Sequence, residues 1–242
     1  MSTTDAVSMV VPARFTGPPG SANGGWVAGR LAGLSRLAGA VQVTLRHPPP
    51  LEVDLDVRTA DGRTTLGFGG AEIAEAVAGA LAGHLVDPVD PDTAEDVMAR
   101  YAGWTSHPFP GCFACGTDRP APDGLGLRPG RLLDRPDTVA TTWLPDASLA
   151  DADGCLPPHL VWAALDCPGG WSSDLVGRPM VLGRMTAQVD ATPRAGELCV
   201  LVGQHLADDG RKTYTASTAY DSDGRVLGRA EATWIAVRTL PA

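Results

Sequence analysis

The chain has 242 residues, of which 44% are hydrophobic and 19% are charged, so it can bury a core and does not have the composition of a disordered protein. Its 28 acidic and 19 basic residues give a formal net charge of −9, which argues against a nucleic-acid partner because a phosphate backbone attracts cationic surfaces. The 29 glycines and 21 prolines predict many turns and short strands.

The two kinds of segment that would direct the chain to a membrane are not found in the sequence. The N-terminal residues MSTTDAVSMVV lack a basic segment followed by an apolar run, so no signal peptide is predicted. No stretch reaches the roughly eighteen uncharged apolar residues that a membrane span needs. We therefore expect a cytoplasmic protein without a membrane partner.

The first half of the chain predicts one helix flanked by strands. Asn23 stands before the glycines that open Gly24–Leu37 and is a favourable N-cap, so we predict a helix there. Apolar runs bounded by Gly, Pro and Asp predict strands on both sides of the helix. These strands are expected at Val7–Phe15, Val41–Leu45, Leu51–Arg58 and Arg63–Phe68.

The segment Ala71–Leu85 supports two interpretations. Its residues Ile73, Val77, Leu81 and Leu85 recur at a spacing typical of a helix. Alternatively, AEIAEAVAG aligns with RVLGRAEAT, which opens the last predicted strand of the second half. We predict a strand from this alignment, since alanine-rich sequence is weak support for either state.

The second half repeats the order of the first, with a strand, a loop, a helix and then further strands. The helix is predicted within Pro157–Leu175, whose prolines are tolerated in a first helical turn. The strands are expected at Thr138–Leu144, Arg184–Ala191, Leu198–Ala207, Lys212–Asp221 and Arg225–Val237.

A short helix and an ordered connection are predicted between the halves. Asp92, with Glu95 three residues later, predicts the start of a linker helix that ends near Tyr101. The predicted organisation is therefore an N-terminal unit at 1–90, a connection at 91–135 and a C-terminal unit at 136–242.

Cys112 and Cys115 form a C-x-x-C pair within the connection. A zinc knuckle would need a second such pair, and although His107 lies five residues upstream, no other pair is formed by Cys155, Cys167 or Cys199. A redox pair should open a helix, whereas here a run of turn-forming residues follows. We predict two buried thiols in a structural turn and no metal site.

One helix per half, wrapped by about five antiparallel strands, resembles the hotdog domain. The loop and helix start at 17–25 resemble those of hotdog acyl-CoA thioesterases of the phenylacetate-pathway type, in which a His-Gly-Gly follows such a loop. The sequence 112–116 together with 124–127 resembles a leader found before a hotdog unit. The resemblance covers nearly the whole chain and implies an α+β double hotdog.

The resemblance also implies which residues act. Members of the family place a catalytic acid on the central helix nine residues after that histidine, and hold the thioester carbonyl with the N–H of the first glycine. Here Asn23 replaces the histidine, and the acid position of the first half is Ala32. In the second half the acid position is Asp166, nine residues after Pro157, but Pro158 occupies the glycine position and has no N–H.

The first half therefore has the glycine N–H group but no acid, and the second half has the acid but no such N–H group. The resemblance implies that in two-fold hotdog pairs the site is shared across the interface. We predict one composite site in which Asp166 faces Gly24 and Gly25, while Asn23 orients a water molecule or only caps the helix. The predicted substrate-binding residues are Trp26, Trp162 and Trp171 in an acyl pocket, His159 at the helix start and Arg184 at a coenzyme A phosphate. The alternatives are core tryptophans, a surface histidine and a surface ion pair, respectively.

The resulting functional hypothesis is hydrolysis of an acyl-CoA thioester, with no cofactor beyond the coenzyme A of the substrate. The alternative is a non-catalytic acyl-CoA-binding or sensing protein with a degenerate site. A hotdog hydratase is disfavoured because no histidine follows an Asp at the five-residue spacing of that class. A homodimer of double hotdogs is a further possible assembly.

Overall fold

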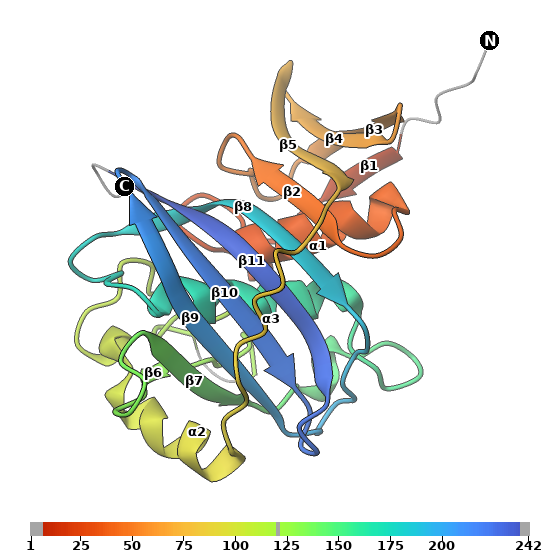
Figure 1. Cartoon of the computed structure of the whole chain (residues 1–242). Coiled ribbons are helices and arrows are strands. Elements are labelled where there is room, and N and C mark those ends of the chain that lie inside the picture. Colours follow the sequence, from red (N-terminus) through yellow and green to blue (C-terminus); the bar gives the residue numbers. More distant parts are fainter. Residues whose placement is uncertain (1–6, 120–121, 238–242) are drawn as a thin grey trace.

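The computed structural model describes residues 7–119 and 122–237, within which eleven strands form one antiparallel sheet (Figure 1). The same residues contain the helices α1 (Gly24–Ser35), α2 (Pro91–Val97) and α3 (Pro158–Trp171). The strands are β1 (Val7–Val10), β2 (Val41–Leu45), β3 (Asp54–Ala60), β4 (Arg63–Phe68), β5 (Ala71–Ala78), β6 (Gly130–Arg131), β7 (Thr138–Trp143), β8 (Met180–Val189), β9 (Cys199–Asp209), β10 (Lys212–Tyr220) and β11 (Val226–Ala236).

The sheet contains the same topology twice. Its strand order is β1-β3-β4-β5-β2-β8-β11-β10-β9-β7-β6. Outward from the central β2–β8 pair, each half presents the strand that follows its helix, then its last strand, then its earlier strands in reverse order. The halves join where Val41 lies opposite Ala187 and Thr44 opposite Arg184. The arrangement confirms the predicted α+β double hotdog, with α1 and α3 as the two central helices.

Most predicted elements are present, and the ambiguous segment is a strand. β5 covers Ala71–Ala78 and pairs with both β2 and β4, so the strand prediction is confirmed up to that residue. Its alanines suit this place because Ala74 and Ala76 are buried under α1, where larger side chains would separate the helix from the sheet. The predicted domain limits at residues 90 and 135 stay predictions.

Several element boundaries differ from the predictions. The first strand ends at Val10 instead of Phe15, because a 3-10 turn at Ala13–Phe15 follows Pro12. The linker helix is capped by Asp90, whose carboxylate accepts the Thr93 N–H at 2.9 Å, and not by Asp92. A proline at the first helical position moves the start of this helix to residue 91.

The strand that follows α3 is longer than predicted at its start. β8 begins at Met180, whereas the sequence pattern predicts a start at Arg184. Val181 lies opposite Ile235 in the register with β11, so the added residues are paired. This extension matters for function because residues 180–183 line a cavity of about 350 Å³.

α1 and α3 lie on the same side of the sheet and touch each other directly (Figure 1). The contact is made through glycines one helical turn apart on α1. A Cβ atom at Gly25 would lie 2.6 Å from the Cβ atom of Asp166, and one at Gly29 would lie 2.7 Å from the Cα atom of His159. At Gly25 and Gly29 the two helix backbones therefore approach more closely than a side chain at either position would permit.

This close approach predicts opposite effects for two alanine substitutions on α1. Gly29→Ala should destabilise the protein by about 1–3 kcal/mol because its methyl group overpacks the helix contact. Gly33→Ala, which has no atom within 4 Å of its added methyl group, should stabilise by about 0.5–1 kcal/mol because glycine disfavours a helix interior. Urea unfolding of both variants measures the difference. Stabilisation by both substitutions would contradict the described contact.

The opposite face of the second half is covered by the extended segment 79–90, which crosses in front of β10 and β11 in Figure 1. The Val86 N–H donates to the Thr218 hydroxyl at 3.1 Å, and the Tyr220 hydroxyl donates to the Val86 carbonyl. Val86 and Val89 also pack in an apolar cluster with Val202 of β9. The sheet of this half is thus covered on both faces.

The sequence predicts neither a signal peptide nor a membrane-spanning segment. Most of the N-terminal sequence from which no signal peptide is predicted lies outside the described residues. Within residues 7–119 and 122–237, none of the helices has the length and apolar character needed to cross a membrane.

Candidate active site

Asn23 caps α1 and also reaches the acid of the other half. Its Oδ1 atom accepts the Trp26 N–H at 2.8 Å, as the sequence predicts for an N-cap. Its Nδ2 atom lies 3.4 Å from Oδ2 of Asp166, and the side chain is 2% exposed. Capping and contact with the acid are therefore both made by the same amide.

Asp166 lies on α3 with its two carboxylate oxygens in different surroundings. Oδ2 accepts the Gly25 N–H at 3.0 Å and faces the Asn23 amide. Oδ1 is buried and has no hydrogen-bond partner among the described residues. One oxygen thus orients the carboxylate, while the other is left for a ligand that enters the site.

The protonation of Asp166 is set mainly by its burial. Loss of hydration raises the pKa of this carboxyl from 3.8 to about 7, and the nearby Cys112 sulfur adds to the increase. The Gly25 N–H and the Asn23 amide act in the opposite direction, because both stabilise the ionised form. A carboxyl with a pKa in this range can exchange protons near neutral pH.

The start of α1 leaves one N–H group available. The Gly25 N–H is bonded to Asp166 and the Trp26 N–H to Asn23, whereas the Gly24 N–H has no partner among the described residues. Gly24 lies on the cavity wall, at the positive end of the helix dipole. This N–H can therefore donate to an anion or a carbonyl oxygen in the cavity.

The first residue of α3 cannot donate a hydrogen bond to a ligand in this way. That helix begins with Pro158 after an N-cap at Pro157, so neither residue has an N–H group. The structure brings Asn23, Gly24 and Gly25 of one half together with Asp166 of the other. Among the described residues, a helix start with a glycine N–H group faces an acid of the other half once, at α1, and not a second time at α3.

A cavity of about 350 Å³ adjoins these groups. Asn23, Gly24 and Asp166 lie on its wall, together with Arg46 and His47 after β2. The rest of the wall is largely apolar and comes from the loop before α1, the turn after β2, the connection, the end of α3, β8 and β11. Its larger apolar side chains are Phe109, Trp171, Leu175, Met180, Leu182 and Trp234.

Trp26, Trp162 and His159, which the sequence suggests as substrate contacts, are not on the cavity wall. Trp26 stacks on Phe15 with ring centroids 4.4 Å apart and meets the edge of His159 at 5.4 Å. Trp162 packs against Gly29 and is 4% exposed. The two tryptophans form part of the core at the contact between the helices, whereas His159 is half-buried at the start of α3.

Arg184 also lies away from the cavity wall. It is exposed on β8, at the junction of the two halves, where its Nε atom donates to the Thr44 hydroxyl at 3.2 Å. It forms no ion pair with any described carboxylate, so the predicted alternative of a surface ion pair is not found either.

Of the three tryptophans that the sequence suggests for an acyl pocket, Trp171 does lie on the cavity wall. Sequence patterns did not identify Trp234 or Cys167 as site residues, although both lie on the same wall. Cys167 follows Asp166 on the same helix, so proximity to the predicted acid was an available signal. Trp234 lies on the last strand, and only its tertiary position brings it to the cavity.

Comparison with known proteins agrees with this fold. No family model matches the sequence, and no curated protein matches it. The chain is similar in structure to a provisionally assigned thioesterase from Novosphingobium aromaticivorans, with a TM-score of 0.62 and 14% identity, covering 95% of this chain and 94% of that chain.

Two further structures show the same likeness. The tesB protein of Mycobacterium avium subspecies paratuberculosis has a TM-score of 0.61 and 12% identity, with 95% of this chain and 91% of that chain covered. A hotdog-fold protein of unknown function from Alicyclobacillus acidocaldarius has a TM-score of 0.61 and 13% identity, with coverages of 99% and 95%. At these identities the likeness shows a hotdog fold across nearly the whole chain.

Proposed function

We propose that this double hotdog hydrolyses acyl thioesters, with coenzyme A as the thiol part, at the site between Gly24 and Asp166. The observation that supports the proposal most directly is the state of the Asp166 carboxylate. One oxygen is held by the Gly25 N–H, while the other is buried without a described partner, and Gly24, whose N–H is also unpartnered, lies on the wall of the same cavity. An oriented base and a free donor are the two groups that thioester hydrolysis requires.

In the proposed reaction, Oδ1 of Asp166 takes a proton from a water molecule as the water oxygen attacks the thioester carbonyl carbon. The Gly24 N–H donates to the carbonyl oxygen, which carries the negative charge of the tetrahedral intermediate. The carbon–sulfur bond then breaks, and Asp166 returns the proton to the leaving sulfur. The products are one carboxylic acid and one thiol, and the side chains return to their starting state.

The cavity wall favours an apolar acyl group. Trp171, Leu182 and Trp234 offer ring and aliphatic surface beside the acid, so burial of hydrocarbon there is favourable. The cation on the wall is already paired, because Arg46 binds Glu72 at 2.8 Å and also contacts Glu75. We therefore assign the acyl chain to the cavity interior and leave the nucleotide part of coenzyme A outside it.

Release of free thiol from a series of coenzyme A esters, from acetyl to long acyl chains, tests this function. Turnover is expected, and kcat/KM should rise with chain length until the cavity is filled, by up to about fourfold per added CH₂ at about 0.8 kcal/mol each. Binding of these esters by calorimetry without thiol release would contradict hydrolysis and support the acyl-CoA-binding alternative.

A further inference from the structure

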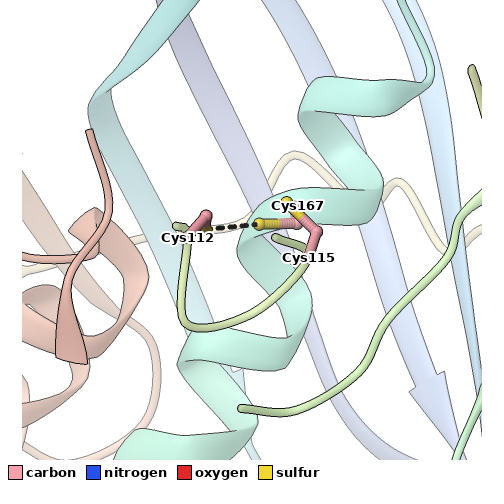
Figure 2. A group of neighbouring side chains, drawn as sticks. All are labelled: Cys112, Cys115 and Cys167. Atoms are coloured by element: carbon pink, nitrogen blue, oxygen red, sulfur yellow. Dashed lines mark hydrogen bonds between the residues drawn. The ribbon is translucent and has the colours of Figure 1, made fainter. Parts of the chain in front are cut away.

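Three cysteines, two from the connection and one from α3, lie close together beside the proposed active site (Figure 2). Cys112 and Cys115 belong to the connection between the halves, and Cys167 lies on α3. Their three sulfur atoms all lie within 4.8 Å of one another, and all three residues are buried. All five cysteines of the chain are free thiols in this structure, so no disulfide explains the convergence.

The separation of two of the three sulfur atoms matches that of ligands around a tetrahedral metal ion. A Zn–S distance of about 2.3 Å places two sulfur ligands of a tetrahedral zinc about 3.8 Å apart. The Cys112 and Cys167 sulfur atoms are 3.9 Å apart. The ring of His107 lies beside the cluster, with its Nε2 atom 3.5 Å from the Cys115 sulfur.

The surroundings of the cluster supply hydrogen-bond donors to the sulfur atoms. The Asn23 side-chain amide donates to the Cys112 sulfur at 3.7 Å. The Trp171 ring N–H donates to the Cys115 sulfur at 3.3 Å. Donors to sulfur of this kind are found around thiolates that bind metal ions.

The backbone of the turn is built tightly around the cluster. Gly116 follows the second cysteine, and a Cβ atom there would lie 2.6 Å from the Cys112 N atom. The Gly116 N–H donates to the Cys112 carbonyl at 2.8 Å, which closes the turn. The turn therefore holds two sulfur atoms toward the third from α3.

We propose that Cys112, Cys115 and Cys167 bind one Zn²⁺ ion as three thiolate ligands. Binding releases to solvent the protons that the thiols still carry and leaves a complex of net charge −1 before a fourth ligand is added. The Arg128 guanidinium donates to the carbonyls of Cys115 and Gly116, at 3.1 and 3.2 Å, and offsets this charge. The ion fastens the connection to α3 next to Asp166, and its binding does not depend on the thioesterase assignment.

Metal analysis of the reduced, purified chain by inductively coupled plasma mass spectrometry tests the site. The expected result is one zinc per chain, with loss of the metal in Cys112→Ser and Cys167→Ser. Cys155→Ser is the matched control, because Cys155 is not part of the cluster, and it should retain the zinc. Trp171→Phe removes a donor to sulfur and should weaken zinc binding by roughly 10–100-fold.

Titration of the unaltered, metal-stripped chain with Co²⁺ gives a second measurement that requires no cysteine variant to fold. One equivalent should produce sulfur-to-cobalt charge-transfer absorption together with the visible bands of a tetrahedral thiolate site, and zinc should displace it. The proposal is overturned if reduced protein contains no zinc and neither ion binds. A mass two hydrogen atoms lower than the sequence requires, with a disulfide mapped within the cluster, would also overturn it.

Discussion

Replacing Asp166 with asparagine should lower kcat for thioester hydrolysis by roughly 10²–10⁴-fold, the usual contribution of general acid–base catalysis. The asparagine has the same shape and can still accept the Gly25 N–H with its amide oxygen. Its amide nitrogen would take the place of Oδ1 and cannot accept a proton from water. The loss should therefore appear in kcat, measured by thiol release with saturating substrate.

The same substitution should not unfold the protein. Asp166 is a buried carboxylate with one oxygen lacking a described partner, and a neutral amide there has a smaller cost of burial. The thermal midpoint should remain unchanged or rise. Asp96→Asn is the control, since Asp96 is exposed on α2, and it should retain full activity. Full activity in Asp166→Asn would remove Asp166 from the mechanism.

Gly24→Pro should lower kcat by roughly 10²–10³-fold, the loss seen when one oxyanion donor is removed from an acyl-transfer site. Proline removes the N–H group that we assign to the carbonyl oxygen, and it adds the atoms of its ring. The backbone permits it, because Gly24 is the first residue of α1 and Asn23 has φ −62° and ψ 126°, which suits a residue before proline. α3 already begins with Pro158 in this position.

Gly24→Ala is the matched control because it adds a Cβ atom but keeps the N–H group. That atom would lie 3.1 Å from the Leu182 and Leu45 side chains, which must shift slightly in both variants. The alanine variant should therefore retain most of its turnover, and circular dichroism should show α1 intact in both. Equal loss of activity in the two variants would assign the effect to packing and not to the donor.

The sequence was sufficient to predict the elements because their signals are local. Asn23 and the glycines after it mark the start of α1, and the end at Ser35 lies two residues from the prediction. The repeated order of elements identified Ala71–Ala78 as a strand despite its helical spacing. Boundaries failed where the decisive partner was distant, as at β8, whose first residues are fixed by pairing with β11.

The candidate site was predicted in part. The resemblance to hotdog thioesterases implied Asn23, Gly24, Gly25 and Asp166 as site residues, and the structure brings them together. The resemblance also implied that the first glycine of the pair holds the thioester carbonyl, and the structure shows how the two glycines differ. Gly25 is needed because α3 packs against it and its N–H is bonded to Asp166, whereas the Gly24 N–H remains available, and both facts depend on the contact between the helices.

The sequence, with its resemblance to hotdog thioesterases, was enough to predict the double hotdog, a site shared by the two halves and the turn with two buried thiols at Cys112 and Cys115. Only the tertiary structure decided which aromatic side chains line the cavity and that Cys167 joins the two thiols. Cys112 and Cys167 are 55 positions apart in the chain, yet their sulfur atoms are 3.9 Å apart. Spacing along a sequence predicts contacts within a turn or helix, but the packing of a connection on α3 depends on the whole core.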